Sequence, residues 1–299
     1  MTLPVHERIP DGLNHRTGLK NLGVVPVGQP VAKYRYRTRK GYLTCELYDV
    51  TQVRPVDPMR VAAGLQATET RKLAEKARRQ AACAQAEQDA LKMYQHAVDR
   101  AVKRFRFWHD DPQTGYLDTE TTGLSGQVIE VALVDRHGHM QFHSLVRPTI
   151  PVEPEAQAVH DLSDAELADA PSWTEVAQQL RPWLDGRRIV AFNADFDQAR
   201  LKTSDEAHGL PPQDNPPIWR CAMEAFGPLH GDWSDYHGDW RWASLLGACR
   251  QMGVPPEAAT HRALGGAQAL ARLVSAVATR EWPVLTVADV PKDFVEWPE

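Results

Sequence analysis

The chain has 299 residues, a formal net charge of −5 and four cysteines. This length is ample for one domain of ordinary size together with an additional segment. The cysteines are scattered without a Cys-x-x-Cys pair, which argues against a zinc site or a disulfide framework and favours a reducing, cytoplasmic location. There is no apolar run of ~18 residues, as a membrane span requires, and no apolar segment typical of a secretory signal, so we expect no membrane association.

The charge is divided unevenly along the chain. Residues 1–110 carry 20 Lys and Arg against 11 Asp and Glu, whereas the remainder carries 14 against 28. A basic segment of this kind is typical of proteins that contact an anionic polymer, most directly a nucleic-acid backbone. We therefore expect a basic N-terminal region over 1–110, a main domain over 111–285 and a C-terminal tail over 286–299.

In the N-terminal region, residues 1–30 are interrupted by Gly and Pro and are expected to be poorly ordered. The residues that follow alternate between apolar or aromatic and basic side chains, and a hairpin is expected over about 31–50. Basic residues beside Tyr34, Tyr36 and Tyr42 could bind phosphates while the rings stack on bases. The alternative is a small hairpin whose basic face is only solvated.

The composition predicts a long helix over about 68–107. This stretch is rich in Ala, Glu, Lys, Arg and Gln and contains no Gly or Pro. A narrow apolar stripe runs along it, and three roles for the helix are open. It could mediate self-association or bind a protein partner, it could lie along the main domain, or it could act as a spacer.

The main domain is predicted to be α/β, with strands first and helices later. Strands are expected at 115–118, 128–134, 140–146 and around Ile189, and helices at 173–184 and near Trp219, Trp242 and His261.

The most informative stretch is 116–124, which reads Tyr-Leu-Asp-Thr-Glu-Thr-Thr-Gly-Leu. Asp118 and Glu120 are two residues apart on a predicted strand, so both carboxylates face one side. Like charges held that close raise each other's pKa unless a cation lies between them. Hard oxygen ligands suit Mg²⁺ or Mn²⁺. The alternative for an isolated Asp-x-Glu pair is a solvated acidic edge of a strand.

Two downstream segments extend this pattern. An apolar run leads into Asn193, with Asp197 at the start of a predicted helix. Ligands collect at the carboxyl ends of strands in open α/β sheets, which would bring Asp197 beside the first pair. A compatible alternative makes Asp195 or Asp197 a helix N-cap. His261 then precedes an apolar-periodic helix; alone it would be interpreted as structural, but it is the third part of an ordered set.

Together, residues 114–280 resemble the DEDDh, or DnaQ-like, 3′–5′ exonucleases, the family of the DNA polymerase III proofreading subunit. The family motif D-x-E-T-T-G-L is matched from Asp118 to Leu124, and N-x-x-F-D is matched by Asn193, Phe196 and Asp197. In the third motif, H-x₄-D, His261 is present, but Gly266 replaces the fourth carboxylate. Three motifs in order are a specific signal. The resemblance implies a ribonuclease H-like mixed sheet flanked by helices.

The resemblance also implies phosphodiester hydrolysis with two bound ions, Mg²⁺ or Mn²⁺. Asp118 would contact both metals, Glu120 would hold the metal that binds the nucleophilic water, and Asp197 would hold the second. His261 would take the proton from that water as general base.

The implied substrate contacts follow from the same motifs. Thr121 and Leu124 would pack against the terminal nucleotide, while Thr122 and Gly123 would shape the turn beneath it. Two more positions, Thr119 and Asn193, complete the predicted substrate-binding set.

Gly266 is the departure from the family pattern. No carboxylate at 265–268 compensates for it. Two Gly in a helix cost about 1 kcal/mol each relative to Ala, so no local reason for the glycine is evident. We predict a metal-dependent exonuclease that acts on the 3′ end of nucleic acid, single-stranded DNA above all, with turnover impaired by Gly266. The alternatives are a protein that holds 3′ ends without cutting them and a scaffold whose long helix recruits a partner.

Overall fold

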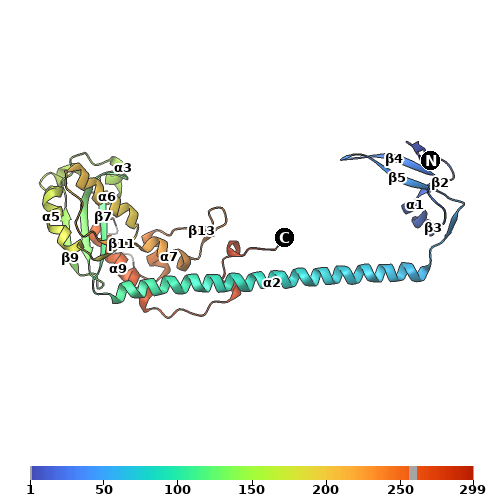
Figure 1. Ribbon diagram of the computed structural model, residues 1–299. Coiled ribbons are helices and arrows are strands. Elements are labelled where there is room, and N and C mark those ends of the chain that lie inside the picture. Colours follow the sequence, from blue (N-terminus) through green and yellow to red (C-terminus); the bar gives the residue numbers. More distant parts are fainter. Residues whose placement is uncertain (1, 256–260, 299) are drawn as a thin grey trace. The chain divides into compact units, whose positions relative to one another are not determined.

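The computed structural model describes residues 2–255 and 261–298 and divides the chain into two compact units, one ending at Ala82 and one starting at Cys83 (Figure 1). One helix, α2 (Pro58–Asp110), contributes to both units. The division therefore lies inside α2 and not at 110, where the expected N-terminal region ends. The reason is that Tyr94, Val98 and other apolar residues in the second part of α2 are buried in the core of the second unit.

The first unit is a small β-rich fold. The four strands of its larger sheet lie in the order β1-β4-β5-β2, and β3 pairs separately with β6. Their bounds are β1 (Val5–His6), β2 (Leu13–His15), β3 (Val24–Pro26), β4 (Ala32–Thr38), β5 (Gly41–Asp49) and β6 (Val53–Pro55), with the helix α1 (Arg16–Asn21) after β2.

The expected hairpin is present as β4 and β5, which pair antiparallel from Ala32 opposite Leu47 to Thr38 opposite Gly41. The expectation that residues 1–30 are poorly ordered is wrong. They supply both edge strands of the sheet and α1, whose Leu19 is fully buried together with Ala32 and Leu47. The Gly and Pro residues in this segment separate short elements, and the contacts that stabilise those elements come from the hairpin.

The helix α2 is longer than the predicted 68–107. It starts at Pro58, where a missing N–H costs no helical hydrogen bond, and it continues through Gly64 to Asp110. Its buried residues all lie in the second part: Ala90, Tyr94, Val98, Ala101, Val102, Phe105 and Trp108. Leu73, by contrast, is 63% exposed. Only the second part of the predicted apolar stripe is therefore buried in the core of the second unit.

The second unit is built on a five-stranded mixed sheet. Its order is β11-β10-β7-β8-β9, with β7, β10 and β11 parallel and β8 and β9 antiparallel to their neighbours. The bounds are β7 (Thr114–Thr121), β8 (Val128–Val134), β9 (Met140–Leu145), β10 (Arg188–Ala191) and β11 (Ile218–Cys221). Every residue of β8 is buried, because helices cover both faces of the sheet.

The helices that flank this sheet include those predicted at 173–184 and near Trp219, Trp242 and His261. They are α3 (Pro154–His160), α4 (Asp164–Leu167), α5 (Trp173–Leu184), α6 (Ala194–Ala207), α7 (Ala222–His230), α8 (Leu245–Gln251) and α9 (Ala263–Thr279). Trp219 itself lies in strand β11, three residues before α7, because residues 218–221 pair with β10. The prediction of a mixed sheet flanked by helices is confirmed.

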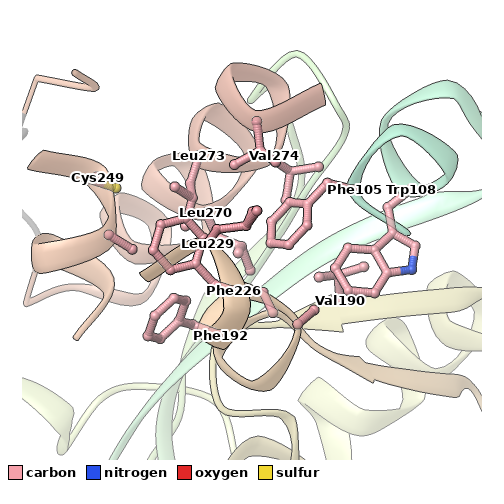
Figure 2. Packing of buried hydrophobic residues seen from close by; sticks show 14 of the residues in the cluster. Phe105, Trp108, Val190, Phe192, Phe226, Leu229, Cys249, Leu270, Leu273 and Val274 are labelled. Carbon is pink, nitrogen blue, oxygen red and sulfur yellow. The ribbon is translucent and has the colours of Figure 1, made fainter. Parts of the chain in front are cut away.

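One face of the sheet packs against α2, α7, α8 and α9, and the other packs against α5. Figure 2 shows the first of these cores, in which Phe105, Phe226 and Leu270 lie close together although they come from three different helices. The expected tail over 286–299 also joins this unit. Phe294 stacks on Trp240 with ring centroids 5.2 Å apart. Within the described ranges, no helix is both long enough and apolar enough to cross a membrane.

Candidate active site

Three carboxylates meet where β7 approaches its carboxyl end beside α6. Asp118 and Glu120 lie on one face of β7, and Asp197 lies in the first turn of α6, which follows the parallel strand β10. The alternation of the strand turns Thr119 to the opposite side, where its hydroxyl donates to Asp197 Oδ1 at 2.7 Å. Asp197 is only 3% exposed. This hydrogen bond links the first and second predicted motifs directly.

The pKa values of all three carboxylates are raised. Burial raises the pKa of Asp118 well above its ordinary value, and the negative charges of Asp197 and Glu120 raise it further. Burial, followed by the charges of Glu130 and Asp197, raises the pKa of Glu120 to about 7. Burial also raises the pKa of Asp197 to about 7, although the hydrogen bond from Thr119 opposes that shift. Such a cluster favours either protons or a bound cation.

The donor set of this cluster fits a hard divalent cation. Asp118, Glu120 and Asp197 offer carboxylate oxygens, the ligands that Mg²⁺ and Mn²⁺ prefer. Among the described residues, no three acidic, His or Cys side chains already form a group that could hold one ion.

Gly266 lies directly against Asp118. The helix α9 packs on β7 and β8, and a Cβ atom built on Gly266 would lie 2.8 Å from Asp118 Cγ and overlap with its carboxylate oxygen. A side chain at 266 would thus displace the carboxylate of Asp118 from its present position. The sequence alone suggested no local reason for a glycine here; the close approach of Asp118 supplies one.

The turn that follows β7 is closed by its own hydroxyl groups. The Thr121 hydroxyl donates to the carbonyl oxygen of Gly123 at 2.9 Å, and the Thr122 hydroxyl accepts from the Gln127 N–H at 3.0 Å. A Cβ at Gly123 would overlap with the carboxylate of Glu153, so a larger residue there would displace the end of that side chain. Leu124 is 84% exposed at the tip of this turn. The turn is thus held by these hydrogen bonds and exposes the apolar side chain of Leu124 to the solvent.

One more buried carboxylate, that of Glu130, lies beside the cluster, and the sequence motifs did not predict it. Glu130 is directly opposite Glu120 in the pairing of β7 with β8, and it is 1% exposed. It accepts hydrogen bonds from Arg262 Nε at 2.8 Å and Nη2 at 3.1 Å and from the Ala263 N–H at 3.2 Å. His143 Nε2 lies 2.7 Å from Glu130 Oε1, the oxygen that also accepts from Arg262 Nη2. Burial alone would raise the pKa of Glu130, but these hydrogen bonds lower it to about 2.

A signal for Glu130 was present in the sequence. The run Val-Ile-Glu-Val-Ala-Leu-Val has one charged residue in a strand that is otherwise apolar on both faces. A charge in such a strand is stable only when it is paired and hydrogen-bonded, which predicts a specific partner. The partner, Arg262, is the residue directly after the predicted catalytic His261.

His261 lies just before α9 in the chain. It is exposed, it directly precedes the N-cap residue Arg262, and its ring makes no hydrogen bond to any residue in the described ranges. Asn193 is the N-cap residue of α6 and is likewise exposed, with no side-chain hydrogen bond to the helix. The geometry thus brings Asp118, Glu120 and Asp197 to one edge of the sheet, and His261 and Asn193 are exposed at the starts of α9 and α6.

A mixed sheet of this order, with clustered carboxylates on β7 and α6 and a Thr-Thr-Gly-Leu turn after β7, defines a ribonuclease H-like nuclease. Residues 116–274 match the exonuclease family RNase_T. The chain belongs to this family of hydrolytic, metal-dependent exonucleases. The resemblance expected from the motifs, including the ribonuclease H-like fold, is confirmed.

Individual relatives are similar over the same part of the chain. The uncharacterized exonuclease CP81 of Escherichia phage 186 is 28% identical over 185 residues, which cover 59% of this chain and 93% of that protein. Exodeoxyribonuclease 10 of Escherichia coli K12 is 30% identical over 182 residues, covering 58% and 73%. A solved structure of exonuclease X with 5′ overhanging duplex DNA is 28% identical, covers 60% of this chain and 99% of its own, and has a TM-score of 0.43.

Proposed function

We propose that the chain removes nucleotides from the 3′ end of DNA, and that Gly266 limits its turnover. The main support is the cluster of Asp118, Glu120 and Asp197: burial raises the pKa of each carboxylate, and neighbouring negative charges raise those of Asp118 and Glu120 further. The DNA preference is supported by the name of a relative, exodeoxyribonuclease 10, which is 30% identical to the chain.

Asp118, Glu120 and Asp197 are the residues that would hold Mg²⁺ or Mn²⁺. Two such ions, when bound, stabilise the charge that develops on the attacking and leaving oxygens of a phosphodiester. Asp118 would contribute to both positions, Glu120 to one and Asp197 to the other. The family's fourth ligand would stand at 266, where this chain has glycine, so one of the two positions keeps fewer protein ligands.

The remaining predicted site residues would contact the substrate or accept the proton of the attacking water. His261, exposed before α9, would accept the proton of the attacking water as a general base. Leu124, exposed at the tip of its turn, and Thr121 would pack against the terminal nucleotide. Thr119 orients Asp197 through its hydrogen bond, and Thr122 and Gly123 keep the turn in shape. Asn193, exposed at the N-terminus of α6, would contact the substrate backbone.

A second candidate function is binding of 3′ ends without cleavage. The observation that favours it is the close approach of Gly266 to Asp118, because no side chain fits at 266 while the Asp118 carboxylate keeps its present position. The two candidates differ in one measurable property, the release of nucleotides in the presence of a divalent cation.

The test uses the full chain with single-stranded DNA and RNA of equal length, labelled at either end, in Mg²⁺ and in Mn²⁺. The proposal predicts slow loss of mononucleotides from the 3′ label, a shortening ladder from the 5′ label, faster reaction on DNA and none in EDTA. Tight binding without any release would support the second candidate. Release from the 5′ end would contradict both.

A further inference from the structure

The first unit carries a basic face that the nuclease site does not explain. In the hairpin of β4 and β5, residues alternate between two faces, and Lys33, Arg35 and Arg37 share one of them. Tyr42 is directly opposite Arg37 in the strand pairing, so its ring belongs to the same face. Residues 1–82 carry 15 Lys and Arg against 7 Asp and Glu, so this face lies in a strongly positive unit.

The residues of this face are available to a ligand. Tyr42 is 61% exposed, and the guanidinium of Arg35 lies 4.6 Å from the centroid of its ring. Over the described ranges, neither Arg35 nor Arg37 forms an ion pair. A cation–π contact of this kind orients the guanidinium while leaving its N–H groups at the edge free to donate.

The turn between the strands extends the same charge. The Thr38 hydroxyl donates to the carbonyl oxygen of Gly41 at 2.8 Å and accepts from the Lys40 N–H at 3.2 Å. These bonds fix the turn and keep Arg39 and Lys40 exposed at its tip. At the other end of the face, Lys33 is opposite Glu46, so the unopposed charge is concentrated between Arg35 and the turn.

The opposite face of the hairpin has a different character. Its Tyr34 and Tyr36 rings stack on each other with centroids 5.7 Å apart, beside a pocket of about 310 Å³. Cys45, which is directly opposite Tyr34 in the strand pairing, also lines that pocket. This face therefore presents two rings stacked on each other and no Lys or Arg of the two strands, whereas the first face presents an exposed ring among basic side chains.

We propose that the face formed by Arg35, Arg37 and Tyr42 binds single-stranded nucleic acid, with a base stacked on Tyr42 and adjacent phosphates on the two arginines. An exposed ring between basic side chains supplies the two interactions that single strands require, stacking and backbone neutralisation. This site lies in the first unit alone and goes beyond the proposed nuclease function. It would bind a strand whether or not the nuclease site is loaded with metal.

The test measures binding of the full chain to a fluorescent single-stranded DNA in EDTA, which separates this site from metal-dependent cleavage. Tyr42→Ala should weaken binding about tenfold, the loss of one stacked base. Tyr36→Ala, on the opposite face, is the matched control and should change affinity less than twofold. Arg35→Ala combined with Arg37→Ala should lower the slope of log K against log salt by about 1.4, as two lost phosphate contacts require.

A second pair of arginines controls for bulk charge. Arg71 and Arg78 are exposed on α2 in the same unit, and replacing both by Ala removes the same charge elsewhere. The proposal predicts a weak effect for this pair, and circular dichroism should show all variants folded. Equal losses for the two arginine pairs, a larger loss for Tyr36→Ala than for Tyr42→Ala, or no binding by the full chain would each overturn it. A folded Tyr42→Ala variant with unchanged affinity would do so as well.

Discussion

Glu130 accepts hydrogen bonds from both Nε and Nη2 of Arg262, at 2.8 and 3.1 Å, and thereby ties the start of α9 to the strand beside Asp118 and Glu120. The Ala263 N–H adds a third bond at 3.2 Å, so the negative charge also lies at the N-terminus of the helix, where the helix dipole favours it. His261 precedes this anchor by one residue. The position of the predicted general base thus depends on a carboxylate that belongs to none of the three motifs.

Glu130→Gln should weaken this anchor and slow the reaction. The uncharged amide loses the paired interaction with Arg262, and a cost on the order of 2 kcal/mol is expected from hydrogen bonds to a buried charge. Because the pKa of Glu130 is lowered to about 2, its contribution is fully present above the unfolded value of 4.5 and is lost as the pH falls toward 2. Urea unfolding at pH 7 and pH 3 measures both effects, and nucleotide release should show a fall in kcat larger than the change in KM.

Glu206→Gln is the matched control for that prediction. Glu206 forms an exposed ion pair with Lys202 at 3.6 Å, so its loss should change stability by less than about 0.5 kcal/mol. Equal destabilisation by the two substitutions would show that Glu130 has no special role.

Glu120→Gln should stabilise the metal-free protein at alkaline pH. The pKa of Glu120 is raised from 4.5 to about 7, so the folded state binds more protons than the unfolded state between these values. Stability must therefore fall as the pH rises through this window, and the neutral amide removes that cost. We expect a gain of about 2 kcal/mol at pH 8 in EDTA and almost none at pH 4.5. Thermal unfolding at both pH values measures it, with the exposed Glu155→Gln as control.

In saturating Mg²⁺ the native chain should be more stable than the Glu120→Gln variant, the reverse of the order expected in EDTA. A cation among the carboxylates offsets their repulsion in the native chain, and Glu120→Gln lacks one of the oxygens that would bind it. If metal raises the melting temperature of both proteins equally, Glu120 is not a ligand.

Asp161→Gly should stabilise the second unit by about 0.5–1 kcal/mol. Asp161 ends α3 with φ of 58°, the left-handed region that costs a residue with a Cβ and suits glycine. The shift in the urea midpoint, at unchanged m-value, measures the gain. Asp185 ends α5 with φ of −55°, so Asp185→Gly gains nothing there and should destabilise slightly. Similar effects of the two changes would contradict the role of φ.

The motifs predicted the carboxylate cluster because local spacing determines it. Two residues apart on β7, Asp118 and Glu120 share a face whatever surrounds them, and parallel pairing of β10 with β7 brings Asp197 to the same edge. The capping boxes at Ser172 and Ser163 likewise mark where α5 and α4 begin. These features were accessible from the sequence because each depends on a few neighbouring residues.

The features that sequence reasoning missed depend on distant contacts. Glu130 and Arg262 are 132 residues apart, and neither predicts the other without the fold. The same is true of Gly266, whose lack of a side chain is explained only by the close approach of Asp118. Residues 1–30 were misjudged because their short strands are stabilised by pairing with the hairpin and not by their own periodicity.

The most direct test of the account compares nucleotide release by the native chain with three variants, Gly266→Asp, Gly266→Ala and Asp118→Asn, on 3′-labelled single-stranded DNA in Mg²⁺. Gly266→Asp should raise turnover by at least tenfold, since it adds the family's fourth carboxylate once Asp118 rotates. Gly266→Ala should lower turnover, because its methyl group meets the same Asp118 oxygen without adding a ligand. Asp118→Asn should abolish release. Equal rates for the native chain and Gly266→Asp, or full activity in Asp118→Asn, would contradict the proposal that these carboxylates form the active site.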